Sequence, residues 1–392
     1  MDILKRYIDQ QKGEYFRRLD QPGNPASIFV IIPCYNEPEI LITLNSLADC
    51  YPTDSNLSVI VVINDAEGAP EVAVSQNIRT INSISDWQSQ HQDLFFDVQK
   101  IYAPSLPKKW AGVGWARKIG MDEAINQLVE NKCSDGIIIS LDADSLILPN
   151  YLQVVETAFH KSPQFGFFTI HFEHPFEDQK LNPAIREGIV RYELHMRYYR
   201  NAMAWSGYPH AIHTVGSSFA LKASAYVKSG GMNRRKAGED FYFLHKLVLL
   251  GKYGNINSTA VFPASRVSDR VPFGTGAALK KWMAGGSELN YTYSLEAFGH
   301  LKPLLASPYK FWDMTSAELS MGFEQLHPSL CTFCENSNTL AEIVELKKNC
   351  SNAEVFEKRF FHLFNAFWIL KYLNFAHEKL LNRASLRTEP IL

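Results

Sequence analysis

The chain has 392 residues, enough for one large domain with additions or for two domains, with a sizeable core. Hydrophobic residues make up 46% and charged residues 20%, which excludes a disordered chain. With 39 basic and 41 acidic residues the net charge is −2, so the charge balance gives no reason to expect a nucleic-acid partner.

The start of the chain and its cysteines bear on its location. Residues 1–6 lack the apolar core of a signal peptide. No stretch approaches about 18 uninterrupted apolar residues, the length of a membrane-spanning helix. The six cysteines are scattered and form no disulfide framework, and the pair Cys331 and Cys334 lacks further ligands for zinc. We therefore expect a cytoplasmic protein.

Strands and helices are predicted to alternate from residue 25 onward. Two prolines and a glycine within residues 21–25 mark a boundary after a charged N-terminal arm. Beyond it a polar loop follows each early strand, which is typical of a parallel sheet with helical crossovers. Apolar runs predict strands over residues 27–32, 57–63, 95–102, 136–141, 165–172 and 214–221. Helical spacing predicts helices over residues 40–47, 74–90, 151–160, 183–205 and 239–250, and another that opens near residue 112.

Two carboxylates end the strand predicted over 136–141. Asp142 and Asp144 are separated by one alanine. In open α/β sheets ligands bind at the carboxyl ends of the strands. A hard divalent cation that bridges to a phosphate would explain why two acids crowd this strand end. The alternative is a solvated turn, since aspartate favours turns in any case.

Glycines open the helix that begins near residue 112. Gly112 and Gly114 would let a ligand approach free backbone N–H groups, and Arg117 and Lys118 follow directly. Cations early in a helix cost a few tenths of a kcal/mol, roughly, which an anionic ligand would offset. The alternative is an ordinary charged helix surface.

A second acidic pair, Glu239 and Asp240, lies at the predicted start of a helix. Negative charge is favourable at that end of a helix, so the pair could act as a cap and nothing more.

Taken in order, these features resemble glycosyltransferase family 2. The resemblance is carried by Pro33-Cys34-Tyr35-Asn36-Glu37, Asn64-Asp65, the Gly112–Arg117 helix opening and Asp142-Ala143-Asp144. It implies a GT-A fold, an α/β, Rossmann-like and mostly parallel central sheet flanked by helices, over residues 25–275. Residues 1–24 would be an N-terminal helical arm and residues 276–392 an added helical C-terminal region. Lys280-Lys281-Trp282 matches the motif of processive relatives poorly, so a non-processive enzyme is expected.

The resemblance also implies roles for single residues. Asp240 would be the catalytic base, with Glu239 as the second choice. Asp144 would bind Mn²⁺ or Mg²⁺, with Asp142 as a further ligand that lies nearer the ribose or sugar. The residues expected to hold the nucleotide-sugar donor are Pro33, Tyr35, Glu37, Asn64, Asp65, Arg117 and Asp142.

The expected reaction is metal-dependent, inverting transfer of a sugar from a nucleotide-sugar donor to a hydroxyl of a carbohydrate, lipid-linked or other acceptor. One rival is a sugar-nucleotide-binding protein that has lost catalysis, which would place Asp240 far from the Asp142–Asp144 turn. Another is a sugar nucleotidyltransferase, but that reading requires a glycine-rich loop after the first strand, where this chain has Pro33 to Glu37.

Three later segments leave alternatives open. The arginines and tyrosines of residues 183–205 favour a solvated helix face over a phosphate contact. Arg266, Asp269 and Arg270 could form a lid over the donor or an Arg–Asp pair at the sheet edge. The apolar face of the helix over residues 351–370 is expected to pack on the catalytic domain. Its alternatives are a homodimer contact or a peripheral contact with the inner face of the membrane.

Overall fold

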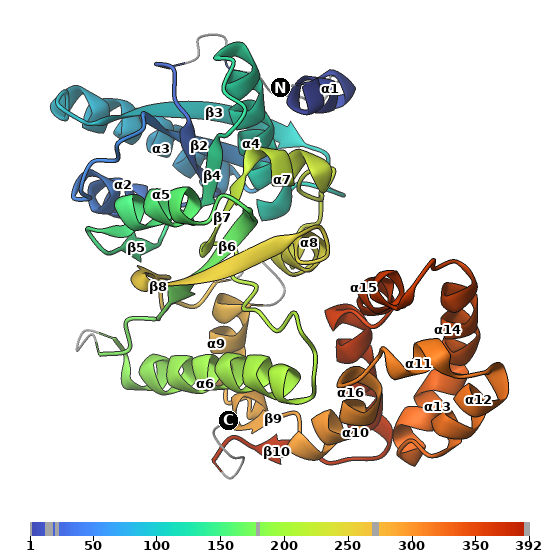
Figure 1. Ribbon diagram of the computed structural model, residues 1–392. Helices are drawn as coiled ribbons and strands as arrows, with labels where there is room; N and C mark the ends of the chain where they lie inside the picture. The colour runs from blue at the N-terminus through green and yellow to red at the C-terminus, as the bar shows by residue number, and fades with distance from the viewer. Residues whose placement is uncertain (1, 12–18, 20–22, 178–180, 269–273, 388–392) are drawn as a thin grey trace. The chain divides into compact units, whose positions relative to one another are not determined.

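The computed structural model describes residues 2–11, 19, 23–177, 181–268 and 274–387 (Figure 1). The chain divides into two compact units. The sheet unit comprises Met1–Leu181 and Thr214–Ala277, and the helical unit comprises Asn182–His213 and Ala278–Leu392.

The sheet unit contains an eight-stranded mixed sheet with the order β3-β2-β1-β4-β7-β6-β8-β5. The strands β1, β2, β3 and β4 run parallel to one another, and β7 is antiparallel to both β4 and β6. The strands are β1 (Ile28–Cys34), β2 (Leu57–Ala66), β3 (Phe96–Leu106), β4 (Ile137–Ser140), β5 (Leu146–Ile147), β6 (Phe165–Phe172), β7 (Phe219–Lys222) and β8 (Lys252–Phe262). Five of the predicted strands are present close to their expected bounds, the one predicted over residues 214–221 is confined to Phe219–Lys222, and β5 and β8 are additional.

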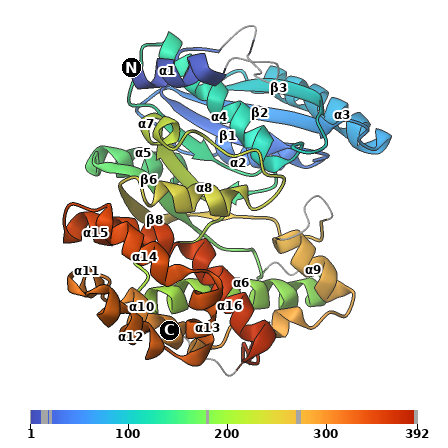
Figure 2. The ribbon, with the colours of Figure 1, turned by 90° about the vertical axis from the view of Figure 1, so that its right-hand side faces the viewer.

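Helices cover both faces of this sheet (Figures 1 and 2). Alternate residues of β1 point to opposite faces, so Val30 and Ile32 join one apolar core while Ile31 faces α4. A Cβ at Gly120 of α4 would lie 2.5 Å from the Ile31 side chain, so this glycine serves close packing of helix on sheet. The helices of the sheet unit are α1 (Asp2–Gln11), α2 (Ile40–Ala48), α3 (Glu71–Gln90), α4 (Val113–Glu130), α5 (Tyr151–Lys161), α7 (Ala223–Lys228) and α8 (Glu239–Leu247).

A buried polar cluster joins the N-terminal helix α1 to α4. Tyr7 donates a hydrogen bond of 2.8 Å to Asp122, and Tyr226 donates another of 2.7 Å to the same carboxylate oxygen. Lys118 completes the cluster with an ion pair of 2.8 Å to Asp122. A carboxylate one helical turn away thus compensates the charge of Lys118, for which an anionic ligand was one of two interpretations.

The helical unit consists of α6 together with the C-terminal helices. The helix α6 (Pro183–Trp205) contacts α10, η1 and β9. Gly188 of α6 lies directly against Leu279 and Trp282. Residues 182–213 were expected to belong to the catalytic domain over residues 25–275, but they pack with the C-terminal helices in the helical unit. The other elements are α9 (Thr275–Met283), η1 (Glu288–Asn290), β9 (Tyr291–Thr292), α10 (Leu295–Leu305), α11 (Lys310–Asp313), α12 (Ser316–Glu324), α13 (Pro328–Asn336), α14 (Thr339–Lys348), α15 (Ala353–Leu363), α16 (Ala366–Lys379) and β10 (Ala384–Ser385).

The apolar face expected near the C-terminus is split between two helices. Asn365 caps α16 by accepting hydrogen bonds from two backbone N–H groups, so the helix does not run through to Leu370. The rings of Phe360 and Phe364 are 4.3 Å apart, and Phe360 also stacks on Phe311. This aromatic face is therefore buried within the helical unit itself. Among the described helices none combines the length and apolarity needed to cross a bilayer.

Candidate active site

The loops after the parallel strands form the candidate site. In the order β3-β2-β1-β4, the chain leaves β1 toward β2 on one side, while β4 pairs with β1 on the other. Such a switch point is where open α/β sheets bind ligands. Glu37 follows β1, Asp65 is the last residue but one of β2, and Asp142 follows β4. The first predicted site residues thus lie on adjacent strand ends.

Asp65 ties together the loops that follow β1, β2 and β3. Its carboxylate accepts hydrogen bonds from the Ser105 backbone N–H at 2.8 Å and from the Asn77 side chain at 3.3 Å. Asn77 in turn accepts a hydrogen bond of 3.0 Å from the backbone N–H of Asn36, a residue with the positive φ of 49°. Asn64 offers its carbonyl to Asn77 at 3.1 Å. Asn77 was not among the predicted site residues, because nothing in its helical context marks it.

The other two residues predicted on β1 differ in exposure. Pro33 lies inside the buried strand, and Tyr35 is half-buried in the loop that follows. Glu37 is fully buried and holds its own loop by accepting a hydrogen bond of 3.0 Å from the Glu39 backbone N–H.

Arg266 connects the loop after β1 to the loop after β4. Its guanidinium group donates to Glu37 at 3.2 Å and to Asp144 at 2.6 Å, with a further short contact to Glu37. Asp269 and Arg270, which were expected to act with Arg266, lie outside the described residues. Arg266 also pairs with the exposed Glu39 at 3.5 Å, so its three acidic partners lie 229, 227 and 122 positions away in the chain.

Arg117 connects the two acidic motifs. Its guanidinium group lies in a buried position of α4, forming one ion pair with Asp142 and another with Glu239. The Glu239 side chain is only 3% exposed, whereas the Asp142 side chain is 35% exposed. The backbone at Gly216 lies directly against the guanidinium group, leaving no room for a Cβ. Arg117 is therefore paired with carboxylates of the protein, as Lys118 is.

Asp240 lies within electrostatic reach of the same cluster. Burial raises the pKa of Asp240, and the charge of Asp142 raises it further, whereas Arg117 opposes both. The carboxylate also accepts a hydrogen bond of 2.7 Å from the Phe241 backbone N–H. Asp240 directly follows Glu239, which Arg117 joins to Asp142.

Close backbone approach at the start of α4 makes this arrangement possible. A Cβ at Gly112 would lie 2.9 Å from the Lys236 backbone, and one at Gly114 would lie 2.8 Å from the Glu239 Cβ and closer still to the Arg235 carbonyl oxygen. Because backbone atoms cannot turn aside, only glycine lets α4 and the segment before α8 come this near.

We expect Gly114→Ala to push Glu239 and Asp240 away from Arg117, reducing any catalytic activity of this site by more than about tenfold, since misplacement by about 1 Å can cost 10²-fold. Gly322→Ala in α12 is the matched control, because nothing lies within 4 Å of that position. The control should raise stability by up to about 1 kcal/mol through helix propensity. Unchanged activity in Gly114→Ala would show that this close approach does not position the acids.

The sequence of the chain matches Glycosyl transferase family 2 over residues 29–226, just over half of its length. The chain belongs to this family. It is a glycosyltransferase with the GT-A type of sheet.

Solved structures similar to this glycosyltransferase have low identity to it. TarS from S. aureus is 14% identical with a TM-score of 0.42, over 80% of this chain and 53% of TarS. The chain thus spans about half the length of TarS. TarS 1-349 in complex with UDP-GlcNAc is 13% identical with a TM-score of 0.42, over 86% of this chain and 89% of that one. Mannosyltransferase PcManGT from Pyrobaculum calidifontis, in complex with GDP-Man and Mn²⁺, is 17% identical with a TM-score of 0.41, over 96% and 92%. A search of curated proteins found no match.

The family match ends at residue 226. The acidic pair Glu239 and Asp240 and the bridging Arg266 all lie beyond it. Their association with the strand ends therefore rests on the contacts of this glycosyltransferase itself.

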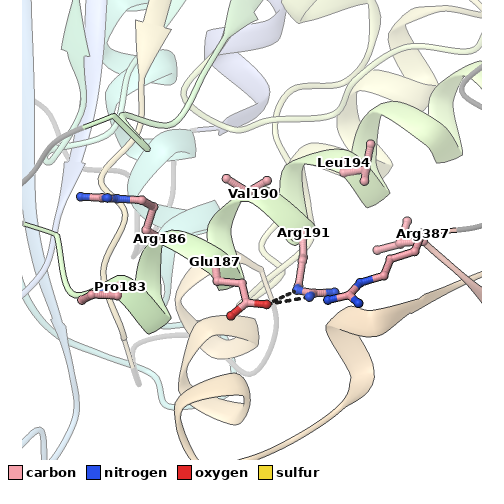
Figure 3. A pocket seen from close by; sticks show the side chains of 8 residues that line it. Pro183, Arg186, Glu187, Val190, Arg191, Leu194 and Arg387 are labelled. Atoms are coloured by element: carbon pink, nitrogen blue, oxygen red, sulfur yellow. Dashed lines mark hydrogen bonds and ion pairs between the residues drawn. The ribbon is translucent and has the colours of Figure 1, made fainter.

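A separate cavity of about 420 Å³ lies on α6 in the helical unit (Figure 3). Its walls are apolar side chains with charged groups at the rim, and none of the predicted site residues contributes to it. Glu187 and Arg191 of α6 form an ion pair of 2.6 Å, and Arg191 also stacks over Trp282. The Arg191 side chain is only 13% exposed, and the other arginines and tyrosines of this helix are half-buried or buried. The prediction of a solvated face for them is therefore wrong. The lining residues are Pro183, Arg186, Glu187, Val190, Arg191, Leu194, Leu386 and Arg387.

Proposed function

We propose that this glycosyltransferase moves a sugar from a nucleotide-sugar donor to an acceptor hydroxyl, with inversion at the anomeric carbon and with a divalent cation. The observation that carries the proposal is the pair of contacts made by Arg117. It binds Asp142 of the strand-end motif and Glu239 of the second acidic motif, and Asp240 follows Glu239. A donor diphosphate and an acceptor hydroxyl need these two groups in one site.

The donor's base and ribose would lie over the ends of β1 and β2. There Asp65 and Asn77 hold three loops in a fixed arrangement. A rigid polar rim of this kind costs little reorganisation when a nucleoside binds. Glu37, with Pro33, Tyr35 and Asn64, completes the proposed nucleoside contacts.

The donor's diphosphate would lie beside the two arginines of the candidate site. The Nε atoms of Arg117 and Arg266 are buried and have no hydrogen-bond partner among the described residues. In each guanidinium group the Nε–H therefore donates no hydrogen bond to the carboxylates that the group pairs with. Guanidinium groups are well suited to phosphate oxygens, so we assign the diphosphate to the neighbourhood of these two arginines.

The carboxylates of the strand-end motif fit a hard divalent cation. Mg²⁺ and Mn²⁺ prefer oxygen ligands, and Asp144 with Asp142 supplies them at a strand end that remains partly exposed. Asp144 is the proposed principal ligand, which would exchange its ion pair with Arg266 for the metal. When bound, such a cation acts as a Lewis acid that stabilises charge on a departing diphosphate.

Asp240 is proposed to take the proton from the acceptor hydroxyl. An alcohol is a weak nucleophile at neutral pH, so removal of its proton as the C1–O bond forms accelerates the attack. The raised pKa of Asp240 improves it as a base, because a catalytic base works best when its pKa lies near the working pH. Attack from the side opposite the diphosphate inverts the anomeric carbon. Glu239, paired with Arg117, would hold the segment that carries Asp240.

The two rival functions are each opposed by an observation. A binding protein without catalysis would not need the second acidic pair beside Asp142, yet Arg117 joins Asp142 to Glu239, the residue next to Asp240. A nucleotidyltransferase would need a flexible glycine-rich loop after β1, whereas Glu37 there is buried and held by Arg266.

Thermal unfolding with nucleotides tests the donor assignment. We expect one nucleoside diphosphate or sugar nucleotide to raise the Tm in the presence of Mn²⁺ or Mg²⁺, because a ligand that binds only the native state adds about 2.7 kcal/mol at 100 times its Kd. In Asp144→Asn the metal-dependent part of the shift should disappear. Asp135→Asn is the control, since Asp135 is exposed before the amino end of the same strand. Absence of any nucleotide effect would count against the donor site, and a wild-type shift in Asp144→Asn would remove Asp144 from the metal role.

A further inference from the structure

Three metal-ligating side chains converge in the helical unit, in a cluster that the proposed reaction does not use. Glu296 and His300 lie one turn apart on α10, and His327 lies immediately before α13. One ligand atom from each of the three lies within 4.8 Å of the other two. Among the described residues this is the one group of its kind.

The two imidazole rings lie face to face. Their centroids are 3.5 Å apart with an angle of 9° between the planes, and the Nε2 atom of His300 is 3.8 Å from a Glu296 oxygen. Ligand atoms on one tetrahedral ion, with bonds of about 2.0–2.1 Å, are separated by about 3.3 Å. The lone pairs of two parallel rings do not converge, so one ring must turn out of the stack for the three ligand atoms to meet on one ion.

The other ring nitrogens are already engaged. Nδ1 of His300 is 2.9 Å from the Tyr372 hydroxyl, and Nδ1 of His327 is 2.9 Å from the Ser329 hydroxyl. Ser329 and Tyr372 are buried and hydrogen-bond to each other at 2.9 Å. Histidines that bind metals use one ring nitrogen as ligand and orient the ring through the other. For His300, the Tyr372 hydroxyl can accept a hydrogen bond from a proton on Nδ1, which leaves Nε2 for an ion. Nδ1 of His327 also accepts a hydrogen bond of 3.3 Å from the Ser329 backbone N–H, which places the proton of the neutral ring on Nε2. Ion binding there requires that proton to move to Nδ1, where the Ser329 hydroxyl can accept its hydrogen bond.

We propose that Glu296, His300 and His327 form a binding site for a transition-metal dication, with Zn²⁺ as the best fit. Two imidazoles and one carboxylate are a ligand set that suits zinc, whereas Mg²⁺ and Ca²⁺ prefer oxygen ligands throughout.

Such an ion would join α10 to the start of α13, two helices separated in the chain by α11 and α12. The ion would bind the folded helical unit and not the unfolded chain. It would therefore stabilise this unit in proportion to its affinity. This metal is separate from the cation proposed for the donor, since its ligands all lie in the helical unit while Asp142 and Asp144 lie in the sheet unit.

Isothermal titration of the full, metal-stripped chain with ZnCl₂ at neutral pH tests the site. The Asp144→Asn chain serves as the background, so that the proposed donor metal does not contribute. We expect one Zn²⁺ to bind and to raise the Tm, and Co²⁺ to give the visible absorption of a four-coordinate site. His327→Asn keeps a side-chain cap on α13, because asparagine is a good N-cap, but it removes the imidazole. This variant should bind Zn²⁺ more than about 100-fold more weakly, since loss of a second-shell partner alone costs about 10–100-fold.

Two further variants complete the test. Glu296→Gln should also lose affinity, whereas His362→Gln, at an exposed histidine of α15, should bind Zn²⁺ like its parent. Wild-type affinity in both His327→Asn and Glu296→Gln would overturn the proposal. So would the absence of Zn²⁺ binding in a chain whose Tm shows that it is folded, in which case the stacked rings serve packing alone. None of these readouts depends on nucleotide binding, so failure of the donor proposal would leave this one unaffected.

Discussion

Asp240→Asn should lower kcat by about 10³-fold while leaving the affinity for the donor within about threefold of the wild type. General-base catalysis contributes about 10²–10⁴-fold, and asparagine keeps the shape of the side chain but cannot accept the acceptor's proton. The measurement is release of nucleoside diphosphate from the sugar nucleotide that stabilises the protein, together with the Kd of that nucleotide. Full activity in Asp240→Asn would remove this residue from the base role.

Stability and pH separate this role from a structural one. Burial raises the pKa of Asp240 in the folded chain above its value in the unfolded chain. The folded state is therefore destabilised as the pH rises from the pKa of the unfolded chain through that of the folded chain, because the carboxylate must ionise in a buried position. Asp240→Asn should therefore not lower the free energy of unfolding at neutral pH. The wild-type kcat should fall as the pH drops through the raised pKa, which lies above the ordinary aspartate value. A marked loss of stability in Asp240→Asn would point to a capping role.

Arg117→Met should be the most damaging single substitution in the sheet unit that we consider. Both Arg117 and Glu239 are 3% exposed in their side chains, so removing the guanidinium group leaves a buried carboxylate without its partner. Breaking a buried ion pair from one side costs about 3–5 kcal/mol. Chemical denaturation should show a loss of this size in the free energy of unfolding, with no measurable transfer activity.

Two variants calibrate that loss. Arg117→Lys keeps the charge, but one ammonium group does not reproduce the two-pronged contact with Asp142 and Glu239, so part of the loss should remain. Lys348→Met removes an ion pair with Glu345 whose side chains are 69% and 66% exposed, and such pairs contribute about 0–1 kcal/mol. A loss in Arg117→Met no larger than that in Lys348→Met would mean that the Glu239 carboxylate is not held by Arg117.

The parallel half of the sheet could be predicted because each strand carries its own signal. Residues 28–34 are buried throughout, so an uninterrupted apolar run marks the strand. By contrast, β8 was missed. Its sequence, Lys252–Phe262, contains a glycine and two asparagines, and its burial alternates irregularly because only part of it faces the core. Its pairing with β6 and β5 comes from distant residues that a local pattern does not contain.

The ion-pair partners of the charged site residues could not be predicted from the sequence either. A carboxylate at a strand end predicts a cation nearby, but the cation could be a metal, a ligand or an arginine. Arg266 reaches Glu37 and Asp144 only because the segment after β8 returns to the ends of β1 and β4. The same limit explains Lys118, whose position early in a helix suggested an anionic ligand and whose partner is Asp122.

The helical unit was foreseen only as a helical region. Local spacing found α6 but could not assign it to the C-terminal helices, since its packing partners lie about 100 residues later. The His300 and His327 pair was equally hidden, because the two rings meet through the course of the chain between α10 and α13.

The division into two units has a consequence for the covalent connections of the chain. The chain passes between the units three times, after Leu181, after His213 and after Ala277. A protease that cuts at one of these passages separates the chain into two fragments, but the two remaining passages still tether the units as long as each unit holds its own segments together. For the same reason residues 29–226 alone do not amount to an independent catalytic piece. They carry α6, which belongs to the other unit, and they lack both β8 and the acidic pair at 239 and 240.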